Sequence, residues 1–360
     1  MKSVIVAIAF LSFSVSLFAQ VLLNADGPGN TYELINSVLA PTGTAVEPPD
    51  CSHESFGRHI TEEWDTNLQA YVFVFYIHVT PDNDRCINFD RQRNEIKTYD
   101  KSPDNLKAAV GETITYKWKF KIDAAFQASS KFTHLHQIKA VGGSEEDMPL
   151  ITFTARKGTP DKLELRYAET LTQETLKDVN LSLFKGVWVE ATETITFGEQ
   201  GKYQVSIKKV SDNTEIFAYS NNSIRMWKTD ADFLRPKWGI YRSLDDAGNL
   251  RDEQVRFANF SITENLPGLI PKTTENTFNL NVFPNPITNL TQISYELPND
   301  AQVRLQLVDV QGKLLNELMD EYSSAGKHLL SLDKKLEKGV YFVRLDVDGA
   351  VAMYKIIGGS

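Results

Sequence analysis

The stretch TITYKWKFKI (113–122) decides the fold class, because polar and apolar residues alternate along it without interruption. Successive side chains of a β-strand point to opposite faces of the sheet. One face of this segment therefore carries Ile114, Tyr116, Trp118, Phe120 and Ile122, and the other carries threonines and lysines. The pattern predicts a strand that packs on a core with one face and meets solvent with the other.

Segments on both sides of this strand have the same character. Further strands are predicted at residues 71–79, 150–155, 187–197, 203–210 and 255–262. The turn signals KGTPD, GEQGK and SDNT separate several of them. Because no segment shows a long helical period, the sequence predicts an all-β sandwich of the jelly-roll type.

The N-terminal end predicts export. Residues 1–19 hold one lysine and then an apolar run that ends in the small residue Ala19, which is typical of a secretory signal peptide. No later segment approaches the roughly 18 apolar residues that a membrane-spanning helix needs. We therefore expect an exported, soluble chain without a membrane span, and we expect it to be a monomer.

The charge of the chain limits its partners. The formal net charge is −9, and acidic and basic residues are interspersed. No basic tract offers a track for phosphates, which argues against nucleic acid as a partner. An anionic substrate is compatible with this charge, because local positive charge in a cleft matters more than the global sum.

The two cysteines, Cys51 and Cys86, lie in the first third of the mature chain. In an exported protein they favour a disulfide over two free thiols. A disulfide that closes this loop would contribute on the order of 3 kcal/mol. Two cysteines alone do not form a zinc site, and the sequence contains no HExxH, CxxC or glycine-rich phosphate loop.

A change of composition divides the mature chain. The strand-rich region spans residues 20–264, and a linker rich in Pro, Thr and Asn follows at 265–277. Residues 278–360 then show short strand patterns, which predict a small immunoglobulin-like sandwich. This second region contains no cluster of catalytic side chains.

The C-terminal region contains the blocks NVFPNPITN, LVDVQGKLL, KGVYFVRL and VAMYKIIG in that order. It resembles the C-terminal sorting domain of the type IX secretion system of Bacteroidetes. The resemblance implies an export address that is read by the type IX secretion machinery, is often removed on secretion and takes no part in the chemistry. A carbohydrate-binding appendage is the alternative.

Three segments of the larger region each have one polar or cationic face: RQRNEIK (91–97), KFTHLHQIK (131–139) and PKWGIYRS (236–243). If these strands are neighbours in one sheet, their polar faces form a patch suited to an acidic sugar chain. The patch would contain Arg93, Glu95, Lys97, Gln137, Lys139, Lys237 and Tyr241. For any single segment, a solvated face of paired charges explains the pattern better, and only the three together favour a site.

His134 and His136 invite a metal-ligand or general-base role, because only one residue separates them. Strand alternation places both on the face opposite Gln137 and Lys139, as packed or hydrogen-bonded residues. A β-bulge would reverse that parity, and His136 would then be the competing base. Both histidines are therefore kept as candidates for substrate contact.

The same three segments carry a second resemblance. RNEIK (93–97), QIK (137–139) and KWGIY (237–241) are similar to three motif strands of jelly-roll polysaccharide lyases of the alginate-lyase type, with Lys139 where those enzymes have histidine. Longer blocks such as FTHLHQIKAVGG and RPKWGIYRS resemble ulvan lyases of polysaccharide lyase family 28 and glucuronan lyases. The resemblance implies an endo-acting lyase on a uronic acid polymer, and the bacteroidete sorting tail favours ulvan over glucuronan.

Such a lyase removes the C5 proton of a uronic acid, and that proton is only weakly acidic until the adjacent carboxylate is neutralised. We assign the neutralisation to Lys139, helped by Gln137 and Arg93, because stabilising developing charge is usually the largest catalytic contribution. Tyr241 is the expected proton acceptor and would return a proton to the leaving C4 oxygen. Its unperturbed pKa is about 10, so a nearby cation would have to lower it.

Lys237 and Arg242 are the candidates for that cation. Weaker candidates for contacts with neighbouring sugars are Arg166, His59 and His78. The chemistry requires no cofactor, but Asn24, Asp26 and Asp252 offer oxygen ligands for a structural calcium ion, for which ordinary surface groups are the alternative.

Two other functions are compatible with the sequence. One is a non-catalytic carbohydrate-binding sandwich, which would tolerate the loss of the Tyr241 hydroxyl. The other is a glycoside hydrolase, which needs two carboxylates about 5–10 Å apart. The three polar strands supply only Glu95, which argues against hydrolysis.

Overall fold

A computed structural model describes residues 20–265, 278–309, 314–348 and 350–358. The predicted signal peptide at 1–19 and nearly all of the predicted linker lie outside these residues. The described residues form two compact units. The larger one runs from residue 20 to residue 265 and includes residues 337–340, and the smaller one is built from the rest of the C-terminal region.

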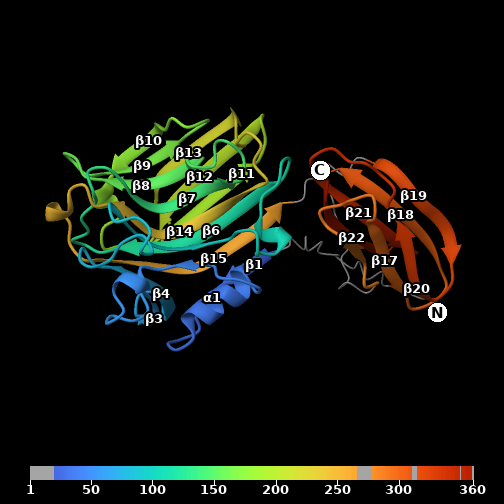
Figure 1. Cartoon of the computed structure of the whole chain (residues 1–360), viewed down its shortest axis with the longest axis horizontal. Coiled ribbons are helices and arrows are strands. Elements are labelled where there is room, and N and C mark those ends of the chain that lie inside the picture. The colour runs from blue at the N-terminus through green and yellow to red at the C-terminus, as the bar shows by residue number, and fades with distance from the viewer. Residues whose placement is uncertain (1–19, 266–277, 310–313, 349, 359–360) are drawn as a thin grey trace, which may run out of the picture. The chain divides into compact units, whose positions relative to one another are not determined.

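Two antiparallel sheets stack in the larger unit (Figure 1). The strands of the first sheet are β1 (Gln20–Leu23), β3 (Ile60–Asp65), β4 (Ala70–Ile77), β6 (Thr113–Ile122), β11 (Val189–Thr196), β12 (Gly201–Lys209), β13 (Glu215–Ile224) and β15 (Glu253–Asn265). They follow the order β13-β12-β11-β6-β15-β4-β3, and β1 also pairs with β15.

The second sheet carries the three polar segments. Its strands are β2 (Val46–Glu47), β5 (Arg91–Lys97), β7 (Thr133–Val141), β8 (Ile151–Arg156), β9 (Lys162–Tyr167), β10 (Glu174–Asn180) and β14 (Phe233–Ser243). They follow the order β10-β9-β8-β7-β14-β5-β2. Because β14 pairs with both β5 and β7, the three polar segments are neighbours, as the patch hypothesis requires.

The core lies between the two sheets. In β6 the predicted alternation is seen directly: Tyr116 and Trp118 are buried, whereas Lys117 and Lys119 on the other face are partly exposed. The Trp118 ring lies 6.0 Å from the ring of Trp238 in β14, so aromatic side chains from the two sheets meet in one core. Edge and tilted contacts of this kind add to the hydrophobic gain of burial. The predicted all-β sandwich of the jelly-roll type is confirmed.

A short helix was not predicted. The helix α1 (Thr31–Leu39) buries Thr31, Ile35 and Leu39, which lie one turn apart on a single face. Its nine residues are too few for a helical period to stand out against the surrounding strands. Short 3₁₀ turns occur at η1 (Asp50–Ser52), η2 (Asp104–Leu106), η3 (Leu181–Leu183) and η4 (Ala247–Asn249). Within the described ranges, no helix has the length and apolar character to cross a membrane.

The smaller unit is also a pair of sheets with its own core. One sheet contains β16 (Asn281–Phe283), β17 (Gln292–Leu297) and β20 (Gly326–Ser331). The other contains β18 (Ala301–Asp309), β19 (Leu314–Ser323), β21 (Gly339–Val347) and β22 (Ala350–Gly358). Buried side chains such as Ile293, Leu305 and Leu345 lie in a core separate from that of the larger unit.

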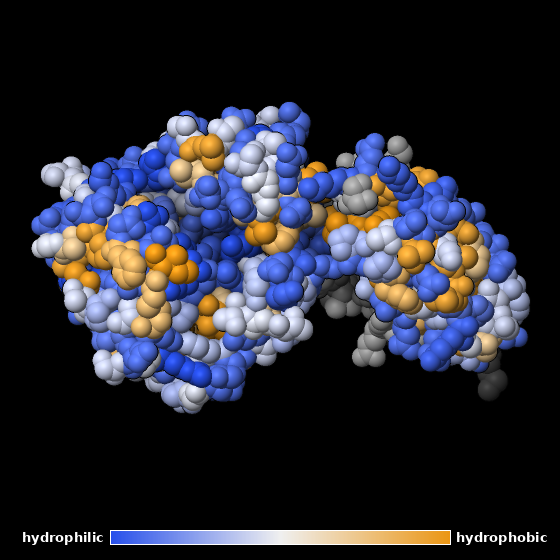
Figure 2. All heavy atoms as spheres, in the orientation of Figure 1, coloured by the Kyte–Doolittle hydropathy of each residue, from blue (hydrophilic) through white to orange (hydrophobic). Residues whose placement is uncertain are grey.

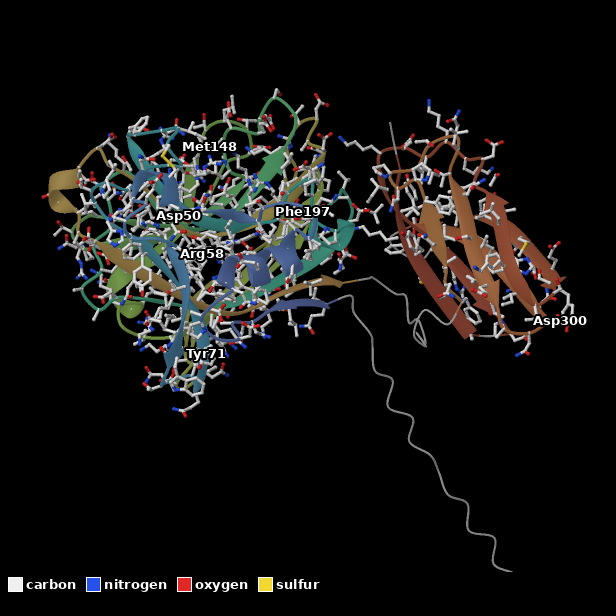
Figure 3. All side chains as sticks on the ribbon, turned by 60° about the horizontal axis from the view of Figure 1, so that its bottom comes forward. Asp50, Arg58, Tyr71, Met148, Phe197 and Asp300 are labelled. Atoms are coloured by element: carbon white, nitrogen blue, oxygen red, sulfur yellow. A yellow bond between two sulfur atoms is a disulfide. The ribbon has the colours of Figure 1, made fainter. Side chains whose placement is uncertain are left out.

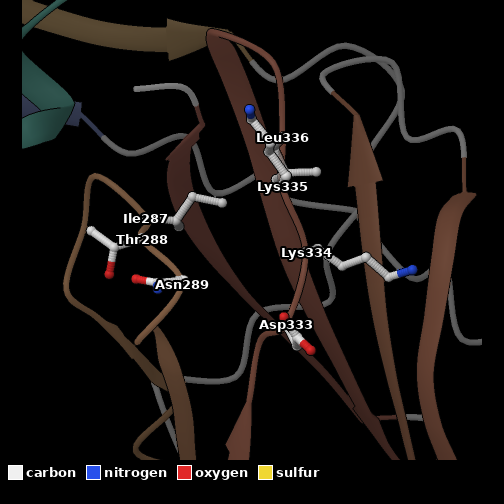
Figure 4. Close-up of a pocket in the computed structure, with 7 residues that line it drawn as sticks. All are labelled: Ile287, Thr288, Asn289, Asp333, Lys334, Lys335 and Leu336. Carbon is white, nitrogen blue, oxygen red and sulfur yellow. The ribbon is translucent and has the colours of Figure 1, made fainter.

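This unit has a pocket of about 450 Å³ (Figure 4). The segment 287–289 lies on one side of it and the segment 333–336 on the other. Its lining contains one carboxylate, Asp333, and two lysines, Lys334 and Lys335. This lining offers no paired carboxylates, histidine or tyrosine for acid–base chemistry.

The predicted disulfide between Cys51 and Cys86 is confirmed. It joins η1 to the loop that precedes β5 across a sequence separation of 35 residues. The alternative of two free thiols is excluded, because no free cysteine is present.

Candidate active site

An open groove of about 530 Å³ lies on the face of the second sheet that points away from the core. Residues of β5, β7 and β14 line it together with the loop residues Asp147, Met148 and Pro149 (Met148 is labelled in Figure 3). Figure 2 shows hydrophilic residues around a hollow in the larger unit, over the region where Figure 1 places β7 and β14. The groove is open at its surface, which suits a polymer better than a small enclosed ligand.

The groove is strongly cationic although the whole chain is acidic. Its lining has nine cationic side chains against the two carboxylates Glu47 and Asp147. The nine are Arg85, Arg91, Arg93, Lys97, Lys131, Lys139, Arg156, Arg235 and Lys237. Local charge of one sign raises the concentration of oppositely charged ligands in a cleft. The groove is therefore suited to an anionic chain.

Several of these cations are already paired in a network beneath the groove, which we call the ion-paired floor. It consists of Glu47, Glu95, Arg93, Lys97 and Lys237. The Lys237 amine lies 2.5 Å from Glu47 Oε2 and 2.8 Å from Glu95 Oε2, and Lys97 lies 2.7 Å from Glu47 Oε1. Arg93 also contacts Glu95 through a short ion pair. Burial lowers the pKa of Lys237 to about 8, although both carboxylates oppose the shift.

The three strands bring the residues of the predicted patch together, and some of these residues form the ion-paired floor. Arg93, Lys97 and Lys237 line the groove as expected from strand parity. Glu95, however, is completely buried below them, and Gln137 donates a hydrogen bond of 2.5 Å to its Oε1. These residues hold one another in place, because an unpaired charge at such a depth would be very costly.

Tyr241 stands at one end of this network. The guanidinium of Arg93 stacks on its ring at 3.7 Å from the centroid, and Arg91 Nη1 donates a hydrogen bond of 3.1 Å to the phenol oxygen. The pKa of Tyr241 is nevertheless raised, because burial outweighs the two arginines. The expectation that a nearby Lys237 or Arg242 lowers this pKa is wrong: the adjacent cations are Arg91 and Arg93, and the phenol is neutral in the resting protein.

His134 faces Tyr241 from the neighbouring strand. Their ring centroids are 5.8 Å apart, and His134 and Tyr241 are direct partners in the β7–β14 register. The His134 Nδ1 lies 2.8 Å from the Thr154 hydroxyl, whereas its Nε2 has no hydrogen-bond partner among the described residues. Burial lowers the pKa of His134 to about 3, so the imidazole is neutral near pH 7.

The position of His134 in the groove corrects the prediction from strict alternation. The register between β7 and β8 shifts between His134 and His136, which marks a bulge at Leu135. Leu135 and His136 both point into the core, and the groove-facing positions are His134 before the bulge and Gln137 and Lys139 after it. A bulge adds one residue to a strand and so reverses the parity of the residues before it.

His136 therefore lies on the other side of the sheet, and its candidacy for substrate contact is wrong. Its Nε2 is 2.9 Å from Glu193 Oε2, and its Nδ1 is 2.9 Å from the backbone carbonyl of Lys237. The imidazole also packs on Trp118, with 4.4 Å between ring centroids. His136 is a core residue, and the bulge makes His134, not His136, the alternative base.

Lys139 and Arg235 form a second pair of groove cations. They are direct partners in the register between β7 and β14. Within the described part of the chain, Lys139 has no ion-pair or hydrogen-bond partner, and Arg235 Nε and Nη1 are buried without one. Burial lowers the pKa of both groups, and repulsion from Arg235 lowers the pKa of Lys139 further. An anion bound between Lys139 and Arg235 would neutralise these two cations.

Lys139 and Tyr241 line the same groove but at different levels. Tyr241 lies opposite His134, and five residues separate His134 from Lys139 along β7. At about 3.3 Å per residue, the two levels are about 16 Å apart between Cα atoms. The role of Lys139 beside the reacting sugar therefore stays a prediction.

Four other predicted contacts are wrong or peripheral. Arg242 is fully buried and donates from Nε to Gln92 Oε1 at 2.8 Å, away from the groove. Arg166 is bound to Gln173, which lines the groove, but does not line it itself. His59 and His78 belong to a separate cluster at the edge of the first sheet. Strand parity and closeness in sequence to the motif strands were therefore not enough to predict which of these four side chains reach the groove.

The predicted calcium ligands do not form one site. Asn24 follows β1 and lies beside the middle of β15, next to Phe260, whereas Asp252 immediately precedes the first residue of β15. Eight residues of extended chain between positions 252 and 260 span about 26 Å. Asn24 accepts a hydrogen bond from Asn259 and Asp252 accepts one from the amide of Val79, and the amide of Asp26 is bound by Glu62.

Arg91, Arg235 and the loop cation Arg85 line the groove but were not predicted from the sequence. Arg91 opens the segment RQRNEIK and has the same parity as Arg93, so strand alternation could have placed it in the patch. Arg235 precedes a proline, which made the start of β14 look like a turn. Arg85 comes from a loop that the disulfide holds against the sheet, and no local pattern predicts its position.

A family model matches only the C-terminal region of the chain. Residues 281–358 match the family of secretion system C-terminal sorting domains. The match confirms the predicted sorting domain and supports secretion to the extracellular space or the cell surface. No curated protein matches the chain.

Solved structures that resemble the chain include three polysaccharide lyases. The endo-β-1,4-glucuronan lyase of the fungus Trichoderma reesei aligns with a TM-score of 0.42 and 15% identity, over 58% of this chain and 89% of that one. The PL-14 alginate lyase of Aplysia kurodai gives 0.48 and 12%, over 68% and 98%. An alginate lyase of Pseudomonas aeruginosa gives 0.39 and 14%, over 57% and 86%. At such low identities and scores these neighbours do not assign a reaction to this chain.

Proposed function

We propose that the chain is a secreted, endo-acting polysaccharide lyase that cleaves a uronate-containing polysaccharide by β-elimination, and that its substrate is ulvan. The observation that carries the proposal is the groove, which combines local positive charge with a tyrosine and a neutral histidine placed face to face. The similarity of RNEIK, QIK and KWGIY to the motif strands of jelly-roll lyases supports it. The sorting domain supports an extracellular polymer as substrate.

The two unpaired cations would bind the carboxylate of the reacting uronate. Lys139 and Arg235 lie opposite each other and lack an anion, whereas Lys97, Arg93 and Lys237 are already paired in the ion-paired floor. Neutralising the carboxylate makes the neighbouring C5 proton more acidic. Preorganised charge of this kind acts without reorganisation during the reaction.

His134 and Tyr241 would move the protons. The imidazole of His134 is neutral near pH 7 and its Nε2 is available, so it can accept the C5 proton once the negative charge of a bound uronate raises its low pKa. The phenol of Tyr241 is neutral and its oxygen accepts a hydrogen bond from Arg91, so its own proton is available for the leaving C4 oxygen. The C5–H and C4–O bonds break, a double bond forms between C4 and C5, and the chain end that leaves carries a hydroxyl.

The arginines beside Tyr241 would stabilise the phenolate that this transfer leaves behind. Arg91 lies within hydrogen-bond distance of the oxygen, and Arg93 covers the ring. Proton transfer from His134 to Tyr241 through solvent then restores both residues. The ion-paired floor keeps Arg93 in position, because Asp84 and Glu95 bind its guanidinium from below.

The floor also argues against hydrolysis. Glu47 and Glu95 are the carboxylates of the ion-paired floor, and both are bound to Lys237. Their pKa values are lowered, since the surrounding cations outweigh burial. A glycoside hydrolase needs one carboxylic acid that is protonated and ready to donate. Neither residue meets that requirement.

Ulvan is chosen over glucuronan because the sorting domain resembles that of Bacteroidetes, the group whose ulvan lyases share the longer sequence blocks.

The test is incubation of the secreted protein with ulvan, glucuronan and alginate, followed by ultraviolet absorbance of the 4,5-unsaturated product. A rise with ulvan alone is expected. A rise with another of the three would correct the substrate, and binding without any rise would make the chain a carbohydrate-binding protein.

A further inference from the structure

A cluster of three histidines and one aspartate lies at the edge of the first sheet, outside the groove lining. It consists of His53, His59, His78 and Asp82, whose potential ligand atoms all lie within 4.8 Å of one another. His53 follows η1, His59 precedes β3, His78 follows β4, and Asp82 lies in the loop before β5. Two stretches of the chain, residues 53–59 and 78–82, thus bring four ligand-type side chains to one point.

The carboxylate of Asp82 lies at the centre of the cluster. Its Oδ1 is 3.0 Å from His53 Nδ1 and 3.2 Å from His59 Nε2, and its Oδ2 is 3.0 Å from His78 Nδ1. Two ligands of a tetrahedral zinc ion at about 2.1 Å from the metal are about 3.4 Å apart. The three distances around Asp82 are close to this value, and all potential ligand atoms of the cluster lie within 4.8 Å of one another.

The surroundings orient the ligands. Asp50 Oδ1 accepts a hydrogen bond of 2.8 Å from His59 Nδ1, which leaves Nε2 of that ring directed at the cluster (Asp50 is labelled in Figure 3). Tyr32 donates a hydrogen bond of 2.9 Å to the other oxygen of Asp50. A carboxylate that binds the outer nitrogen of a metal-ligating histidine is the usual support of a zinc site. The arrangement around His59 has this form.

We propose that His53, His59, His78 and Asp82 bind a zinc ion that has a structural role. Three imidazole nitrogens and one carboxylate oxygen suit zinc, whereas calcium and magnesium prefer oxygen ligands alone. Four protein ligands fill the coordination shell of a structural site and leave no open position for a substrate.

Burial is consistent with this site. The side chains of His59 and Asp82 are fully buried, and those of His53 and His78 keep 20% and 17% of their surface exposed, which gives an ion a way in. The ring of Phe56 covers the cluster at 4.3 Å from that of His78 and 4.7 Å from that of His59.

The site would hold the loop that supports the groove. Asp82 is two residues from Asp84, which binds the Arg93 guanidinium, and the disulfide partner Cys86 lies in the same loop. The other disulfide partner, Cys51, is two residues from His53. Metal and disulfide would therefore fasten the same two segments, η1 and the loop before β5, at neighbouring points.

The test uses the full secreted chain, purified without a histidine tag. After removal of metals by a chelator, the protein is titrated with zinc chloride, freed of excess zinc by gel filtration and analysed by mass spectrometry for metal content. One zinc per chain is expected. Stabilisation by a bound ion should raise the unfolding midpoint of the larger unit by on the order of 5 °C. Cobalt in place of zinc should give the visible absorption bands of a tetrahedral site.

Two variants make the assignment specific. His78→Gln should lose the bound zinc and the increase in unfolding midpoint, and His328→Gln, which changes a histidine of the smaller unit, should keep both. The proposal would be overturned if the wild-type protein retained no zinc and had the same unfolding midpoint in zinc and in chelator. It would also be overturned if His78→Gln retained one zinc per chain. These measurements need no substrate, so their outcome is separate from that of the lyase assay.

Discussion

Replacing Tyr241 by phenylalanine removes the hydroxyl that the proposed mechanism needs and little else. The ring keeps its stacking on the Arg93 guanidinium at 3.7 Å and its packing against Phe132 at 5.1 Å between centroids. Only the hydrogen bond from Arg91 is lost. Arg91 is partly exposed and still paired with Asp90, so this loss should cost about 1 kcal/mol or less of folding stability.

The expected loss of activity is much larger. General acid–base catalysis by one side chain contributes about 10²–10⁴-fold to a rate, which corresponds to about 3–5 kcal/mol of activation free energy. We therefore expect Tyr241→Phe to lower kcat by about 10²–10⁴-fold. KM should change by only about threefold or less, because a hydroxyl that acts in the transition state contributes little to ground-state binding.

The assay is the initial rate of ultraviolet absorbance with ulvan, with the unfolding midpoint measured on the same samples. Tyr167→Phe is the matched control, because it also removes a hydroxyl from a buried tyrosine, one that donates to the Arg225 carbonyl at 2.8 Å away from the groove. The control should keep wild-type kcat. A kcat of Tyr241→Phe within tenfold of wild type, or a loss confined to KM, would refute the proposed proton transfer.

Three further predictions follow from the same structure. Lys139→Ala should lower kcat about 100-fold, the usual effect of removing one charge-stabilising donor. Lys107→Ala, which lies outside the groove, should keep the wild-type kcat. Equal rates of the two variants in the ultraviolet assay would remove Lys139 from the mechanism. Replacing Cys51 and Cys86 by serine should lower the unfolding free energy by about 3 kcal/mol, as measured by urea unfolding, and an unchanged midpoint would show that the disulfide adds no stability. Burial raises the pKa of Glu253 to about 7; its stabilising effect is present below the unfolded pKa of about 4.3 and is lost as the pH rises through about 7. Glu253→Gln should therefore flatten the dependence of the unfolding midpoint on pH between 5 and 8, and a wild-type slope in the variant would contradict the assignment.

The strands and the face of the second sheet were predictable because they depend on local alternation. In β5 and β14 nothing interrupts the period of two, and Arg93, Lys97, Lys237 and Tyr241 all lie where parity placed them. The burial of Glu95 below the groove was not predictable from one strand. It depends on Lys237 from the neighbouring strand, which neutralises it.

The position of His134 was missed for a different reason. A single extra residue at Leu135 changes the parity of β7, and an apolar residue between two histidines gives no local sign of a bulge. The histidine cluster was missed because its members come from two stretches of the chain whose spacing fits no short metal-binding motif. Tertiary structure alone brings them together.

The bulge in β7 has a practical consequence for anyone who compares this chain with its relatives. His134 before Leu135 and the odd-numbered positions Gln137 and Lys139 after it face the groove, so a scan of β7 that assumes one phase would assign the positions before the bulge to the wrong environment. In a relative that lacks the extra residue at Leu135, each position aligned with the residues before it would point to the opposite face of the sheet. Alignments of this strand should therefore treat the pairs His136–Trp238 and His134–Tyr241 as two separate anchors, because the register between β7 and β14 also shifts between them.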